Sequence, residues 1–114
     1  MIDWDHVEEL RAEIGDDGFC EVVDLFLEEV ELVVDRLEAA PDPATFEQDL
    51  HFLKGSAWNL GFAEFGSLCM AGEKLAGDGR AAGIDIREIT RSYRASRVTF
   101  MAGARGFCSK LSAA

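Results

Sequence analysis

Apolar residues recur every three or four positions along nearly the whole chain, which is the spacing of one face of an α-helix, and no segment alternates like a β-strand. The spacing predicts helices over residues 3–14, 18–39, 43–60, 63–76 and 85–110. The boundaries coincide with residues that end or begin helices, notably Gly15, the Pro41-Asp42-Pro43 run and Gly61.

The predicted helix over residues 18–39 carries a broad apolar stripe, wide enough to form the core of a bundle. The stripe contains Phe19, Val22, Val23, Phe26, Leu27, Val30, Val33, Val34 and Leu37. Four long helices joined by short connections predict an all-α fold, an antiparallel four-helix bundle with an additional short N-terminal helix acting as a lid. With 114 residues, we expect a single domain spanning 1–114.

The net charge is −11, divided unevenly between −15 over residues 1–50 and +4 over residues 51–114. Such a balance argues against nucleic-acid binding, which depends on a basic face. The acidic half is interpreted as a solvated face, with a field that steers a basic partner as the functional alternative. No apolar run is long enough to cross a membrane, and the acidic N-terminus does not resemble a signal peptide, so we expect a cytoplasmic protein.

The cysteines are Cys20, Cys69 and Cys108, an odd number without a CxxC spacing. This pattern argues against a zinc site and against a disulfide framework. We expect buried free thiols in a reducing compartment. The scattered cysteines and the two histidines, His6 and His51, give no ligand spacing for a metal.

His51 is the residue at which chemistry is expected. On the helix predicted over residues 43–60, it lies about 140° from the centre of the core stripe, so its ring should face solvent. Lys54 is three residues further on, within side-chain reach of the ring. Gly55 occupies the next position on this face, although a glycine inside an exposed helix costs about 1 kcal/mol relative to alanine. Its missing Cβ leaves room for a bulky group on the imidazole or for a partner.

An exposed imidazole, a cation one turn away and a cleared gap suit a histidine that carries a phosphoryl group. A solvated surface with no function is the alternative for an isolated His-x-x-Lys pair. No acidic cluster that could hold Mg²⁺ accompanies His51, so any such metal must come with a partner.

The run His51-Phe52-Leu53-Lys54-Gly55-Ser56-Ala57-Trp58-Asn59-Leu60-Gly61 resembles the signature of histidine-containing phosphotransfer (HPt) domains, H-x-L-K-G-[SA]-[SA]-x-x-[LIV]-G, at every fixed position. Phe65, Cys69 and Glu73 fall where the family often has L-x-x-x-C-x-x-L-E. Two residues depart from the family pattern. Leu50 stands where alanine is frequent, and Gly72 stands where leucine is usual, which we expect to loosen packing.

The resemblance implies that His51 is the phosphoacceptor through Nε2, that Lys54 steadies the phosphoryl group and that Gly55 gives access to it. Ser56, Asn59 and Gly61 are expected to have structural roles. Trp58 lies on the His51 face, where we expect it to contact a partner. For Phe52, core packing and partner contact remain equally open.

We therefore expect a phosphoryl carrier of a two-component phosphorelay, without kinase activity of its own, since the chain has no glycine-rich phosphate loop. Its partners would be receiver domains of response regulators, a hybrid sensor histidine kinase, or both. The chain needs no cofactor, because Mg²⁺ belongs to the partner receiver, and we expect a monomer. The alternative is a helical adaptor that binds such partners without carrying phosphate.

Overall fold

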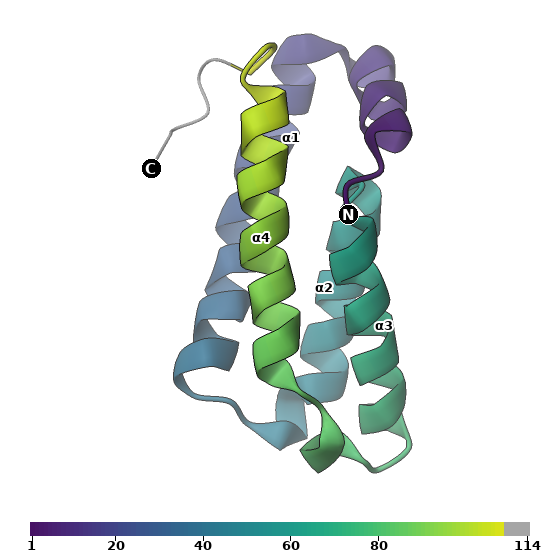
Figure 1. Ribbon diagram of the computed structural model, residues 1–114, viewed down its shortest axis with the longest axis vertical. Helices are drawn as coiled ribbons and strands as arrows, with labels where there is room; N and C mark the ends of the chain where they lie inside the picture. Colours follow the sequence, from purple (N-terminus) through teal and green to yellow (C-terminus); the bar gives the residue numbers. More distant parts are fainter. Residues whose placement is uncertain (109–114) are drawn as a thin grey trace.

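The computed structural model describes residues 1–108 and is built from helices that run up and down along one axis (Figure 1). They are α1 (Trp4–Ala39), α2 (Phe46–Leu60), α3 (Ala63–Gly77) and α4 (Ile86–Ala104), with single 3₁₀ turns at Pro43–Thr45 and Ala81–Gly83. Within the described residues, the only strand-like pairing is an isolated antiparallel bridge between Ile2 and Phe62. The predicted all-α bundle is confirmed. The last helix ends at Ala104, earlier than predicted, and residues 109 and 110, which we placed in it, lie outside the described residues.

Gly15 divides α1 into two parts. Its φ of 78° and ψ of 163° are not helical, and glycine adopts this region without the steric cost that a Cβ would bring. Residues 4–14, hereafter the N-terminal segment, therefore turn away from the rest of α1 and lie across one end of the bundle (Figure 1). Asp3 caps the segment by accepting from the backbone N–H of His6 at 3.2 Å. The predicted lid is present, and the break occurs at the predicted residue.

The core follows the predicted stripes closely. Every member of the α2 stripe is buried, namely Phe46, Leu50, Leu53, Ala57 and Leu60. The stripe of α1 is buried except at Val22, which is 42% exposed, and at Val33, which is half-buried. Aromatic rings fill the centre, where Phe62 contacts Phe26, Tyr93 and Phe100 at centroid separations of 5.0–6.2 Å.

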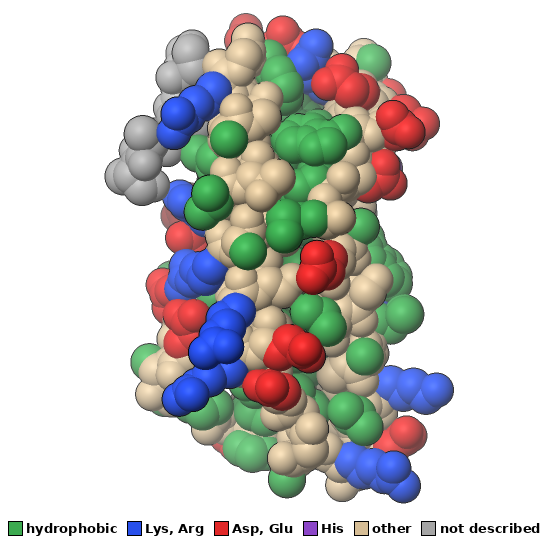
Figure 2. Space-filling view, viewed as in Figure 1, with side chains coloured by type: hydrophobic (Ala, Val, Ile, Leu, Met, Phe, Trp, Pro, Cys, Tyr) green, Lys and Arg blue, Asp and Glu red, His purple; other side chains and the backbone are tan. Residues whose placement is uncertain are grey.

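Arginines of α4 neutralise part of the acidic first half of the chain (Figure 2). Arg94 bonds to Asp35 at 2.6 Å and to Glu38 at 2.8 Å, and Arg97 bonds to Glu31 at 3.2 Å. Ion pairs between the acidic first half of the chain and the more basic second half thus join α1 to α4. Within the described residues, no helix is long and apolar enough to span a membrane.

The expectation of free thiols is wrong for two of the cysteines. Cys20 and Cys108 form a disulfide with a Cα–Cα distance of 5.6 Å, and Cys69 is a buried free thiol. Spacing along the chain gave no hint of this pair, because 88 residues separate its members. The up-and-down topology brings the beginning of the long part of α1 to the same end of the bundle as the end of α4 (Figure 1).

Candidate functional site

His51 lies in the middle of α2 with 70% of its side chain exposed, in the orientation that the helical spacing predicts. The flanking residues Leu50 and Leu53 are fully buried and fix the face that α2 turns toward the core. The His51 ring therefore projects from a rigid helix rather than from a loop. This placement suits a group that must be reached by a large partner.

Glu73 of α3 is the closest polar neighbour of His51. Its Oε2 lies 2.7 Å from Nδ1 of His51, and its Oε1 lies 2.6 Å from Nζ of Lys54. The hydrogen bond from Lys54 is the main cause that lowers the pKa of Glu73, and the bond from His51 acts in the same direction. Glu73 is thus a carboxylate at neutral pH that bridges the imidazole and the ammonium group.

The contact with Glu73 distinguishes the two ring nitrogens of His51. A carboxylate only accepts hydrogen bonds, so Nδ1 must carry the proton that it donates to Glu73. In the neutral ring, the lone pair then resides on Nε2. Within the described residues, no hydrogen bond engages Nε2, which leaves a solvent-facing nucleophile. This agrees with the nitrogen that the family resemblance implies.

Lys54 is less mobile than a surface lysine. Its side chain is only 22% exposed, and Nζ lies 6.0 Å from the ring centroid of Trp58 as well as against Glu73. The ammonium group keeps two further N–H donors, since it has three in all. The shared carboxylate holds this cation on the His51 side of α2.

Gly55 has open space beside it. A Cβ built at Gly55 would meet no atom within 4 Å, so the fold of the chain itself does not require glycine there. The helix nevertheless gives up about 1 kcal/mol relative to alanine. The missing side chain leaves room on this face for a group that approaches from outside.

The two aromatic residues beside His51 lie on different sides of α2. Trp58 is 42% exposed, and its indole lies across Gly66 of α3, where an added Cβ would overlap Nε1. Phe52 is 38% exposed and therefore does not belong to the core. Part of Trp58 is thus used in packing α2 against α3, and both rings keep a similar exposed fraction.

A groove of about 360 Å³ lies between the N-terminal segment, α1 and the later part of α2. His6 and Leu10 of the N-terminal segment form one wall, and α1 and α2 form the others, through Val22, Leu25, Phe26, Glu29, Ser56, Asn59 and Leu60. Val22 and Leu25 are 42% and 55% exposed. Apolar residues this exposed, gathered in one groove, are typical of a protein-binding surface.

Ser56 and Asn59, expected to have structural roles, both line this groove. The backbone carbonyl of Asn59 accepts a 2.8 Å hydrogen bond from Nε2 of His6, which ties the N-terminal segment to the end of α2. His6 therefore packs the lid against the end of α2. Gly61 ends α2 with a φ of 85° in the left-handed region, where glycine is favoured.

The two departures from the family pattern compensate for each other. A Cβ at Gly72 would lie 2.7 Å from Cδ1 of Leu50 and 3.3 Å from Cδ1 of Ile89, so the larger Leu50 occupies the space that a side chain at position 72 would fill. Leu50 is fully buried. The expectation of loose packing is wrong here, since Gly72 allows α2 and α3 to approach closely next to Glu73.

Sequence reasoning missed Glu73 as a member of the site. Its position matched the family pattern, but the contact crosses from α3 to α2 and depends on how the two helices are aligned. Within the described residues, no group of three or more potential ligands could hold a metal ion. The expectation that Mg²⁺ resides on a partner stays a prediction.

A comparison with protein-family models finds one described as Hpt domain, which matches residues 21–97. This match includes the whole of α2 and α3 and therefore the His51 site. Comparisons with curated proteins and with solved structures give no match. Because the family model covers more than half of the chain, the protein belongs to the Hpt domain family of phosphorelays.

Proposed function

We propose that this chain carries a phosphoryl group on Nε2 of His51, which it receives from an aspartyl phosphate of one receiver domain and passes to the aspartate of another. The observation that carries the proposal is the 2.7 Å bond from Nδ1 to Glu73, which leaves Nε2 unprotonated and facing solvent. Membership in the Hpt domain family supports a role in phosphotransfer.

In the forward step, the Nε2 lone pair attacks phosphorus, and the bond from phosphorus to the aspartate oxygen breaks, which returns the receiver's carboxylate. The imidazole keeps its Nδ1 proton and becomes positively charged. Glu73 stabilises that charge through a charge-assisted hydrogen bond. Lys54 keeps donors available for the phosphoryl oxygens, and the Mg²⁺ that such transfers use would be supplied by the receiver.

The groove that Ser56 and Asn59 of α2 line is the surface on which we propose that receivers dock. Gly55 allows close approach to Nε2, and the exposed Val22 and Leu25 of the groove, together with Phe52 of α2, offer apolar contact area. Trp58 contributes the edge that its packing on α3 leaves exposed. Positioning by docking supplies much of what phosphoryl transfer requires, since little covalent chemistry falls to the protein.

The carrier is proposed to act as a cytoplasmic monomer between a hybrid sensor histidine kinase and a response regulator. It has no glycine-rich phosphate loop in its sequence, so it should not take phosphate from ATP. Receiver domains that compete for His51 in the transfer assay below would identify the cognate partners.

The test is a transfer assay with a receiver domain that carries labelled phosphate on its aspartate. Wild-type protein should take up the label in an acid-labile, base-stable form, and a folded His51→Gln variant should take up none. Labelled ATP alone should leave the protein unlabelled. If the wild-type protein binds receivers but takes up no label from a panel of charged receivers, the adaptor alternative replaces the carrier.

A further inference from the structure

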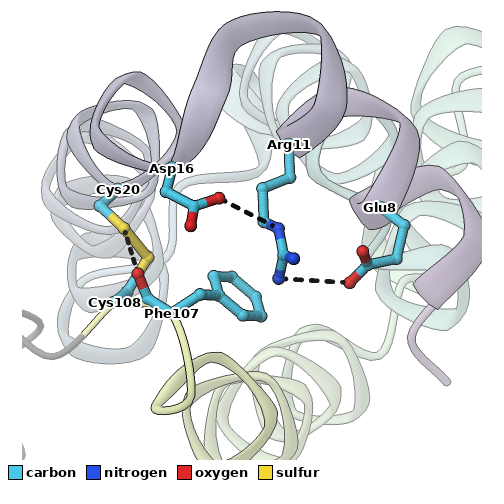
Figure 3. Close-up of a disulfide and its surroundings, with 6 residues drawn as sticks. All are labelled: Glu8, Arg11, Asp16, Cys20, Phe107 and Cys108. Atoms are coloured by element: carbon cyan, nitrogen blue, oxygen red, sulfur yellow. Dashed lines mark hydrogen bonds and ion pairs between the residues drawn. A yellow bond between two sulfur atoms is a disulfide. The ribbon is translucent and has the colours of Figure 1, made fainter.

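The Cys20–Cys108 bond closes the end of the bundle at which the N-terminal segment lies (Figure 3). Cys20 is on α1, five residues after the bend at Gly15, and Cys108 follows the end of α4. The bond therefore fixes the residues that leave α4, including Phe107, to the bundle.

Phe107 is in turn a support for the N-terminal segment. The guanidinium of Arg11 lies 4.2 Å from the Phe107 ring centroid, a cation–π contact (Figure 3). Arg11 also pairs with Asp16 at 3.2 Å and with Glu8 at 3.6 Å, which holds its side chain in this position. The Phe107 ring also packs on Phe19 of α1 at a centroid distance of 5.6 Å, so it lies between the bundle, the disulfide and Arg11 of the N-terminal segment.

The same segment forms a wall of the docking groove. Both His6 and Leu10 line the groove, and His6 bonds to the Asn59 carbonyl on α2. The beginning of the segment has a separate attachment, because Trp4 stacks on Phe100 at 5.8 Å. Loss of the Arg11–Phe107 contact should therefore loosen the later part of the segment without detaching its start.

We propose that the Cys20–Cys108 bond is a redox-controlled clasp, which holds the later part of the N-terminal segment, with Leu10, against the docking groove when oxidised and loosens it when reduced. The effect on docking rests on the proposed function of the groove. In a compartment kept reducing, a disulfide exchanges with cellular thiols, and disulfides found there usually have a redox role.

The thiol chemistry is confined to this pair. Cys69 is fully buried, and burial raises the pKa of its thiol to about 12, so it does not supply a thiolate for exchange. Cys20 is partly exposed, whereas Cys108 is only 2% exposed. Of the two residues of the bond, Cys20 is the more exposed, and the exchange is written with attack on its sulfur.

The reductant is a dithiol, either a small molecule or a protein. One thiolate of the reductant bonds to Cys20 Sγ, the S–S bond breaks, and Cys108 leaves as a thiolate that takes up a proton. The second thiolate of the reductant then attacks its own sulfur in the mixed disulfide and releases Cys20. The protein gains two electrons and two protons, and the reductant becomes a disulfide.

The reduced form should remain folded at this end of the bundle. The Cys20 sulfur lies 3.4 Å from the backbone carbonyl oxygen of Phe107 (Figure 3). A disulfide sulfur has no proton to donate, but the thiol formed on reduction can donate to this carbonyl. Reduction thus exchanges a covalent link for a weak hydrogen bond, which loosens the contact between Phe107 and Arg11.

The test compares the full chain equilibrated with oxidised glutathione and with dithiothreitol. Thiol counting in denaturant should find one free thiol in the oxidised form and three in the reduced form. Hydrogen exchange of residues 4–14 should become about fivefold faster or more on reduction, and the Kd for a receiver domain should rise by a similar factor. The Cys20→Ser/Cys108→Ser variant should match the reduced form under both conditions.

Arg11→Gln is the matched control, because it breaks the contact with Phe107 and keeps the disulfide. Its N-terminal segment should exchange rapidly in both redox states, and retention of the full redox response in this variant would overturn the proposed path. Three free thiols in the oxidised sample, or equal exchange or equal Kd in the two forms, would refute the clasp. Exchange is measured without phosphate, so failure of His51 to accept phosphate leaves the test of the clasp intact.

Discussion

Replacing the Glu73 carboxylate by an amide should slow phosphoryl transfer to His51 while leaving the fold and receiver binding unchanged. In Glu73→Gln, the side chain keeps its length, but it loses the charge that bridges Nδ1 of His51 and Nζ of Lys54. The Nδ1 proton is then held less firmly, and the positive charge that develops on the ring loses its partner.

The magnitude follows from the contact that is lost. A hydrogen bond to a charged group contributes about 1.5–3 kcal/mol, and solvent screens part of this because His51 is 70% exposed although Glu73 is only 20% exposed. Since about 1.4 kcal/mol corresponds to a tenfold change in rate, the discounted energy of about 1–2 kcal/mol predicts that transfer slows by about 5- to 30-fold. Glu73→Ala should slow it at least as much.

The assay is single-turnover transfer from a charged receiver domain, with receiver Kd and thermal stability measured alongside. Nitrogen-15 NMR of the His51 ring should report a proton on Nδ1 in the wild-type protein and a mixture of tautomers in Glu73→Gln. The same substitution made in a Lys54→Met background separates the effect on His51 from that on Lys54. A transfer rate within threefold of wild type, with the tautomer unchanged, would refute the reasoning.

Three substitutions test other parts of the structure. Gly55→Ala should stabilise α2 by up to about 1 kcal/mol in denaturant unfolding, because its Cβ meets no atom of the chain. The same variant should slow phosphoryl transfer in the transfer assay. Transfer at the wild-type rate would show that Gly55 does not provide access to His51. Gly72→Ala should lower the free energy of unfolding by about 1–3 kcal/mol, because its Cβ overlaps Leu50. Adding Leu50→Ala to the same chain should recover part of that loss. A Gly72→Ala variant as stable as the wild-type protein would contradict the close packing. Hydrogen bonds from Arg36 hold the pKa of Asp49 below its ordinary 3.8, so this carboxylate stabilises the fold fully above that value and loses its effect as the pH falls below it. Asp49→Asn should therefore lower the free energy of unfolding by about 1–2 kcal/mol at pH 7, a value that is discounted because Arg36 is 45% exposed. The loss should be smaller in acid, and a loss that is independent of pH would argue against the ion pair.

The helices, their boundaries and the direction of His51 could be predicted because each depends on residues close together in the sequence. An unbroken helical period places the His51 ring once the buried stripe of α2 is known, and Gly15 and Gly61 mark ends through their own backbone preferences. The family motif is local for the same reason, since its residues share a single helix.

Contacts between helices could not be predicted in this way. Val22 continues the apolar stripe of α1, but whether a stripe's edge is covered depends on where the neighbouring helix lies, and here it stays 42% exposed. The Cys20–Cys108 pair and the bond from Glu73 to His51 likewise depend on how helices are aligned. Predicting any of these contacts requires the relative positions of two helices, and the helical periodicity of the sequence does not specify those positions.

The alignment of α2 with α3 is set by packing that flanks the reactive pair. Leu50 fits against Gly72, and Trp58 lies across Gly66, so side chains of α2 occupy space beside two glycines of α3. Moving α3 by one residue would displace Glu73 by about 1.5 Å along the axis and about 100° around it, which would break a contact of 2.7 Å. The buried glycines of α3 therefore act on the chemistry of His51 through position alone. The departures from the family pattern at positions 50 and 72 belong to this packing, because the larger Leu50 occupies the space that Gly72 leaves.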